Sequence, residues 1–208
     1  MPAPEHLLAF VLASALLGIT PGPDIIYVLV RGAAQGPKAG VAAAAGLATG
    51  IVGHTLFAVV GLSALLAASA TAFMVVKFAG AAYLVYLGVR MFTGRDRMDL
   101  AGGGDTKPLG AIYRQTILMN LLNPKVGLFF LAFLPQFVDP AAGPAAPQFA
   151  LLGVIFMAVS FVVMAGAGIA GGQLRRWLAT SESAGRRIQY ATGTVLVALG
   201  LRLALEKV

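Results

Sequence analysis

The sequence predicts an all-α membrane protein in which six transmembrane helices form two inverted three-helix repeats. Three observations support this fold class. The chain is 59% hydrophobic and 11% charged, with a mean hydropathy of +0.86, whereas soluble domains have about a quarter charged residues. Its apolar segments match the roughly 20 residues that a spanning helix needs. Two of these segments are interrupted by proline at matching places in the two halves, so the first and fourth helices are predicted to be broken.

The apolar segments divide the chain into its expected elements. They run over Glu5 to Arg31, Gly40 to Ala68, Ala72 to Phe92, Ile112 to Gln136, Gln148 to Gly172 and Ile188 to Leu205. The stretch from Thr93 to Tyr113 holds three consecutive glycines and Pro108, so it is the one substantial loop. We therefore expect a single transmembrane domain over residues 1–208, with repeat 1 over about 1–95, a cytoplasmic loop over about 94–112 and repeat 2 over about 112–208.

The basic residues predict the orientation of these helices. Lysine and arginine occur in the first, third and fifth connections and are absent from the N-terminus and from the second and fourth connections. Because basic connections face the cytoplasm, both termini are predicted outside. Arg202 and Lys207 run against this tendency. The net charge of +7 thus reflects topology, and we expect no nucleic acid partner.

An internal repeat supports the division into two halves. Val76–Arg90 and Ile188–Arg202 share an alanine, Leu-Val, Leu-Gly and the final arginine in register, so the third and sixth helices resemble copies of one another. With three helices in each copy, the two halves must insert with opposite orientations.

The two proline breaks are the main candidates for a functional site. Thr20 and Asn123 are residue types that cap helix N-termini, and proline suits the first helical position, so each break is expected to start a new half-helix. Free N–H groups at a half-helix start favour an anionic group such as a carboxylate. The alternative is that both prolines only kink inert helices. The residues of these breaks are Thr20, Pro21, Gly22, Pro23, Asp24, Asn120, Asn123, Pro124 and Lys125.

Each break also carries a charge, and a charge in hydrocarbon is costly unless it is paired or hydrated. Asp24 and Lys125 form either a structural ion pair or a site in which Asp24 receives a substrate ammonium or a proton. His54 is either a proton relay or a hydrogen-bonded packing residue. Asn120 either binds ligand or ties helices together.

Two glycine pairs predict close helix packing. Gly46 with Gly50, and Gly168 with Gly172, form the Gly-x-x-x-Gly spacing that lets helix backbones approach one another.

These motifs together resemble the LysE/RhtB translocators. The resemblance rests on Thr-Pro-Gly-Pro followed by Arg31-Gly32, the small-residue second helix with His54, the segment from Lys77 to Gly88, and Asn120 to Lys125 followed by Phe133 to Phe137. It covers nearly the whole chain. It implies an exporter of amino acids or close derivatives in the bacterial inner membrane, driven by the proton or membrane gradient.

One departure from the family bears on the substrate. Many relatives have an acidic residue shortly after the Gly-x-x-x-Gly of the second helix, where this chain has Ile51-Val52-Gly53. Asp24 then becomes the main acidic candidate, and a neutral amino acid is favoured over lysine or arginine.

The expected function is therefore a secondary exporter of a small amino-acid substrate, surrounded by lipid and requiring no cofactor. A cation or metal efflux protein is the alternative, although only Asp24 and His54 are interior ligands and cysteine is absent. No nucleophile accompanies these two residues, so an enzyme is not expected. The sequence leaves open the particular amino acid, the coupling ion and whether the chain forms a homo-oligomer.

Overall fold

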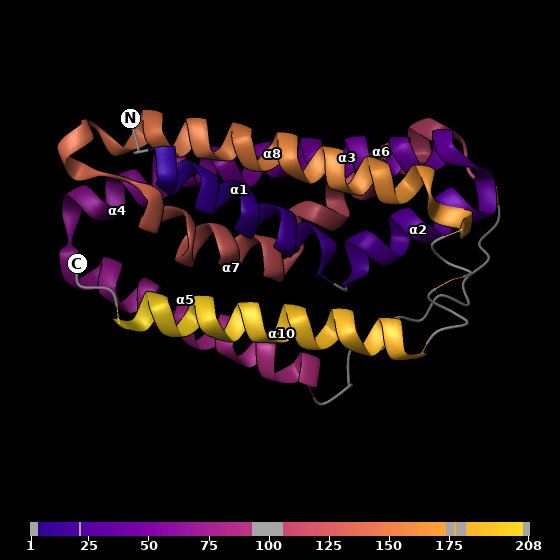
Figure 1. The fold of residues 1–208 in the computed structure, drawn as a ribbon. Helices are drawn as coiled ribbons and strands as arrows, with labels where there is room; N and C mark the ends of the chain where they lie inside the picture. The colour runs from indigo at the N-terminus through magenta and orange to yellow at the C-terminus, as the bar shows by residue number, and fades with distance from the viewer. Residues whose placement is uncertain (1–3, 21, 93–105, 174–176, 178–181, 206–208) are drawn as a thin grey trace.

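A computed structural model describes residues 4–20, 22–92, 106–173, 177 and 182–205, and these residues form helices joined by short connections (Figure 1). Each of the six apolar segments is helical. The α-helices are α1 (Pro4–Ile19), α2 (Pro23–Gln35), α3 (Pro37–Phe57), α4 (Ser63–Ala68), α5 (Ala70–Phe92), α6 (Leu109–Leu121), α7 (Pro124–Ala132), α8 (Ala145–Ile169) and α10 (Glu182–Leu205). A π-helical turn (Ala58–Leu62) joins α3 to α4, and 3-10 turns lie at Leu134–Phe137 and Pro140–Ala142.

The first and fourth segments are each broken in two, as predicted. α1 and α2 meet at 63°, while α6 and the segment Pro124–Phe137 meet at 49°. Proline causes both breaks, because Pro23 and Pro124 lack the N–H group that would continue the preceding helix.

Within the described residues, two helical segments are long and apolar enough to cross a membrane, and up to four are if each bent pair is one span. They are Pro37–Leu65 and Ala145–Ile169, together with the two bent pairs. α5 and α10 have 23 and 24 residues. The expectation of six spans therefore stays a prediction.

Corresponding helices of the two halves run in opposite directions. Figure 1 shows α1 and α2 antiparallel to α6 and α7, α3 antiparallel to α8, and α5 antiparallel to α10. α3 packs on α2, α6 and α8, and α1 and α2 also pack on α8. α5 and α10 form a pair along one side and reach the other helices mainly through α7. α1 begins and α10 ends at the same end of the bundle.

The interior has two regions of different composition. Around α7 and α8 it is aromatic, and the rings of Phe129, Phe130 and Phe156 pack together with centroids 5.1–6.5 Å apart. Around α2, α3 and α8 it consists of small and aliphatic side chains such as Val28 and Ala43. Large apolar side chains such as Leu8, Leu12 and Val162 point outward, as expected for helices in contact with lipid.

Glycine permits the closest helix contacts. A Cβ at Gly50 would lie 2.7 Å from Asn120 Cβ, and one at Gly40 would lie 2.6 Å from Gly168 Cα, so α3 touches α6 and α8 backbone to backbone. Gly46, Gly50 and Gly168 thus pack as predicted. Gly172 does not, because a Cβ there would meet nothing within 4 Å, whereas one at Gly171 would lie 2.9 Å from Ala33 N.

Candidate functional site

The second proline break has the N-terminal cap that its sequence predicts. Asn123 is the N-cap of α7 and its Oδ1 accepts a hydrogen bond from Lys125 N at 3.0 Å, while Pro124 occupies the first turn. The carbonyl of Asn123 also accepts from Val126 N at 3.2 Å. These first-turn N–H groups are therefore already satisfied by Asn123 rather than left free for an anion.

The first break differs from its prediction. Thr20 does not cap α2, because its hydroxyl donates to Leu16 O at 2.8 Å and so belongs to the end of α1. Gly22 is the N-cap and offers no side-chain hydrogen bond, and Pro23 follows it. Pro21 lies outside the described residues. A threonine hydroxyl that bonds the carbonyl four residues back cannot also reach forward.

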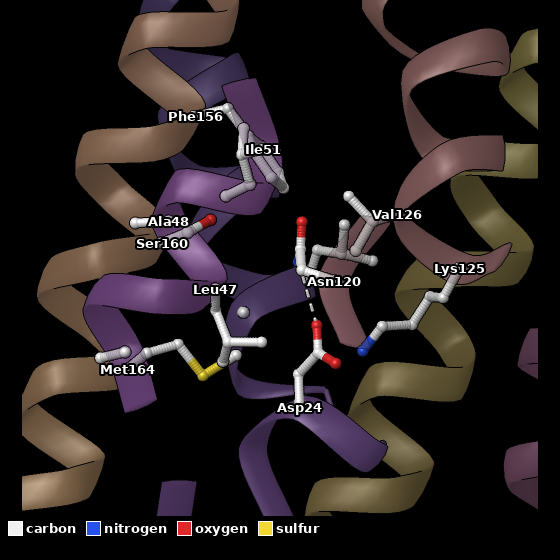
Figure 2. Close-up of a pocket in the computed structure, with 13 residues that line it drawn as sticks. Asp24, Leu47, Ala48, Ile51, Asn120, Lys125, Val126, Phe156, Ser160 and Met164 are labelled. Atoms are coloured by element: carbon white, nitrogen blue, oxygen red, sulfur yellow. Dashed lines mark hydrogen bonds between the residues drawn. The ribbon is translucent and has the colours of Figure 1, made fainter. Parts of the chain in front are cut away.

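The two breaks meet at mid-bundle, where Asp24 of α2 faces Asn120 of α6 and Lys125 of α7 (Figure 2). Asp24 is 3% exposed, and its Oδ2 accepts a hydrogen bond from Asn120 Nδ2 at 3.2 Å. The Lys125 ammonium points toward Asp24 in Figure 2 and donates to Thr20 O at 3.3 Å. Residues about 100 positions apart in the chain thus form one polar centre.

Gly22 makes room for the lysine. A Cβ at this position would lie 3.0 Å from Lys125 Nζ and 3.8 Å from Lys125 Cε. The backbone of Gly22 is extended, a conformation that any residue adopts. The glycine of the first break is therefore explained by the space that the side chain of the second break occupies.

A small cavity lies beside this polar centre. Its volume is about 20 Å³, which suffices for roughly one water molecule. Asp24 Oδ1 and Asn120 Oδ1 are buried and accept no hydrogen bond from any residue that the structure describes. The cavity is lined by Leu17, Gly18, Asp24, Ala44, Leu47, Ala48, Ile51, Asn120, Lys125, Val126, Phe156, Ser160 and Met164. One wall is thus polar and the other apolar.

His54 lies behind the second break rather than on the cavity wall. Its Nε2 is 3.0 Å from the carbonyl oxygen of Asn120, and its ring packs 5.7 Å from that of Phe130. Gly127 leaves space for it, since a Cβ there would lie 3.5 Å from His54 Cε1. His54 therefore links α3 to the C-terminal end of α6. Its partner there is the backbone carbonyl of Asn120, the residue whose side chain binds Asp24.

The sequence reasoning missed the apolar wall and Ser160. This serine is the one polar side chain between Phe149 and Gly172, and that isolation was the available signal. The wall residues come from α1, α3, α7 and α8. Their apolar character alone does not distinguish them from any other packed position in a membrane bundle.

Within the described ranges, no three histidine, aspartate or glutamate side chains gather as metal ligands would. The cation-efflux alternative therefore has no ligand cluster to support it there.

The chain matches known proteins along nearly its whole length. The family model for LysE type translocators matches residues 15–207. The chain is 33% identical over 200 residues to a homoserine/homoserine lactone efflux protein of Salmonella typhimurium, and the match covers 96% of each chain. It is 29% identical over 196 residues to a leucine efflux protein of Enterobacter sp. strain 638, covering 94% of this chain and 93% of the relative. It is also 33% identical over 202 residues to a membrane protein of Vibrio cholerae, covering 96% and 97%. No solved structure matches.

Proposed function

Since the chain belongs to the LysE type translocator family, we propose that it is a secondary transporter that exports neutral amino acids or close derivatives from the cytoplasm. Relatives over almost the full length are named for efflux of homoserine, homoserine lactone and leucine. All three are small, and none carries a charged side chain at neutral pH. The family and these names support amino-acid efflux, and the site supports the neutral substrate.

The main observation is the pairing of opposite charges at one cavity. An amino acid carries an ammonium and a carboxylate on one carbon, and Asp24 and Lys125 offer the complementary charges from two different helices. Asp24 Oδ1 and Asn120 Oδ1 are acceptors without a partner among the described residues, so an ammonium group satisfies both. The carboxylate then meets the Lys125 ammonium and the start of α2 after its N-cap Gly22, since the first-turn N–H groups of α7 are already bound by Asn123.

The rest of the cavity favours an uncharged side chain. Leu47, Ile51, Phe156 and Met164 line it, and a second charge against such a wall is costly. Ile51 stands in the segment where the resemblance implies a carboxylate in many relatives. A cationic side chain therefore finds no partner on this wall.

Transport requires the cavity to open, because a space of about 20 Å³ does not hold an amino acid. We propose that the halves are inverted repeats that rock about the polar centre. The contacts of α5 with α10 support this symmetry. Gly88 lies against Gly193 and Val197, and its repeat equivalent Gly200 lies against Ala81 and Val85, the equivalents of those two residues. Such reciprocal contacts are typical of a two-fold relation.

We further propose that Asp24 alternates between a proton and the substrate ammonium, so that the proton gradient drives export. A buried carboxylate near a lysine can exchange one positive partner for another at little cost in net charge. His54, on the adjoining carbonyl of Asn120, lies where it can respond to that exchange.

Counterflow in proteoliposomes tests this function directly. Vesicles loaded with unlabelled amino acid should accumulate the same labelled amino acid, with neutral substrates exchanged at least tenfold faster than lysine or arginine. Empty vesicles and vesicles loaded with a dicarboxylate are the controls. Exchange of divalent metal with no exchange of any amino acid would falsify the proposal.

A further inference from the structure

Among the described residues, Ser160 lines the cavity with no hydrogen-bond partner for its hydroxyl. The hydroxyls of Ser14, Thr55 and Thr116 donate to carbonyl oxygens four residues back in their own helices at 2.7–3.0 Å. Ser160 is 6% exposed and makes no such bond to any residue that the structure describes. In a membrane helix the carbonyl four residues back is the usual partner of a serine hydroxyl. The Ser160 hydroxyl lacks this bond and is therefore available to a group in the cavity.

The Ser160 hydroxyl reaches the cavity. Ser160 lies among the lining residues on α8, on the far side of the cavity from Lys125 on α7 (Figure 2). α8 runs antiparallel to α3, and close contacts pair Gly40 with Gly168 and Thr55 with Gly153.

This register places Ala48 of α3 across from Ser160 of α8, and both line the cavity. Ala48 carries only a methyl group, so it is a small neighbour on this part of the cavity wall. An amino acid bound at Asp24 and Lys125 therefore faces Ala48 and the Ser160 hydroxyl with its side chain. The rest of this wall is apolar.

We propose that Ser160 is a specificity-determining residue that hydrogen-bonds a hydroxyl on the substrate side chain, so the transporter prefers hydroxyl-bearing neutral amino acids to aliphatic ones of equal length. This inference rests on the proposed function. An apolar wall alone discriminates weakly against an added hydroxyl, whereas a placed hydrogen-bonding group rejects the analogue that lacks it. An aliphatic side chain here leaves the buried Ser160 hydroxyl unsatisfied, which is unfavourable.

The test compares substrates that differ only in the hydroxyl. Counterflow rates for homoserine and norvaline, and for threonine and valine, are measured below saturation in the wild type and in Ser160→Ala. Loss of one hydrogen bond should lower the homoserine-to-norvaline ratio about tenfold. Ser160→Thr keeps the hydroxyl and should keep the preference.

Ser63→Ala is the matched control. The Ser63 hydroxyl also lacks a partner among the described residues, but Ser63 does not line the cavity. Its removal should leave the ratio unchanged. Should Ser160→Ala fail to assemble, Ser160→Cys replaces the hydroxyl by a weak donor of similar size and should lower the ratio in the same direction.

Three outcomes would overturn the inference. In the first, the homoserine-to-norvaline ratio of Ser160→Ala stays at the wild-type value while exchange continues. In the second, both substrates of a pair slow equally. Either result assigns the Ser160 hydroxyl to a bound water or to packing. The third is a wild type that exchanges no amino acid, which removes the proposed function as well. The first two leave the proposed function intact.

Discussion

Asp24 and Lys125 occupy the same position after their respective prolines and carry opposite charges. Each follows the proline that starts its helix, so the two breaks are alike in backbone and unlike in charge. The zwitterionic substrate that we propose needs this inequality, because two identical half-helix starts would offer it the same charge twice. The two halves of the site therefore differ in the charge of the residue that follows each proline.

A double substitution separates binding from folding at these residues. Asp24→Asn should abolish exchange and, by leaving a lysine without its counter-charge, destabilise the protein by about 3 kcal/mol. In Asp24→Asn combined with Lys125→Gln, thermal stability in detergent should return toward the wild type, while counterflow stays at least tenfold lower. Asp139→Asn, in the turn before α8 where Asp139 caps Ala141 N, is the control. Wild-type counterflow in the double variant would make both charges purely structural.

Single residues were predicted unevenly, for physical reasons. Asn123 was identified as a cap because its amide bonds its own first turn, which is a local interaction. The prediction that Thr20 caps α2 was wrong. A threonine hydroxyl can bond either the next helix start or the carbonyl four residues back, and here it donates to Leu16 O. The contact of Asn120 with Asp24 joins positions 96 residues apart, and no pattern along one helix indicates it.

At the scale of elements, glycine positions determine which helix faces touch. Gly50 leaves room for Asn120, so the contact of α3 with α6 fixes the side chain that binds Asp24. The spacing predicted Gly46, Gly50 and Gly168 correctly. It failed at Gly172, because Gly171, two residues after the end of α8, is the glycine that meets α2, and spacing alone does not give the phase of a helix against its neighbour.

A methyl group at Gly50 should damage both the fold and the site. In Gly50→Ala the new Cβ lies 2.7 Å from Asn120 Cβ and 2.9 Å from Ile117 O. Overpacking of this kind costs about 1–3 kcal/mol, so the midpoint of thermal unfolding in detergent should fall and counterflow should slow with it. Gly166→Ala in α8, where a Cβ meets nothing within 4 Å, should unfold at or above the wild-type temperature. Equal midpoints for the two variants would contradict the close contact.

The π-helical turn between α3 and α4 had no signal in the sequence. Ala58–Leu62 reads as an ordinary apolar stretch, and one extra residue in a turn leaves the composition unchanged. Extended apolar runs, by contrast, predicted every α-helix of the described chain, because backbone groups in lipid must be satisfied within the helix.

At the scale of the whole molecule, the arrangement of the ends sets the topology. α1 starts and α10 stops at one end of the bundle, and the turns at Gly36 and the segment entering α6 lie at the other. The helix ends that carry Lys38, Arg90, Arg114 and Arg187 lie at that second end, which we propose to be cytoplasmic. The number of spans and this orientation are predictions that the chain's composition supports.

Cysteine labelling measures the orientation, since the chain has no cysteine of its own. A cysteine in place of Val208 should react with a membrane-impermeant maleimide in intact cells. One in place of Asp99, in the loop before α6, should react only after the membrane is permeabilised. Labelling of the C-terminal cysteine solely from the cytoplasm would reverse the proposed topology.

The shared location of the two chain ends has a consequence for experiments on stoichiometry. Because α1 begins at the end of the bundle where α10 finishes, we expect the tail of one copy and the head of a second to lie on the same side of the membrane. Two copies can then be fused in tandem by a polar linker, with no additional spanning segment, and both keep their natural orientation. An inactivating substitution can then be placed in one half of such a fusion. The transport activity that remains shows how many copies must work together.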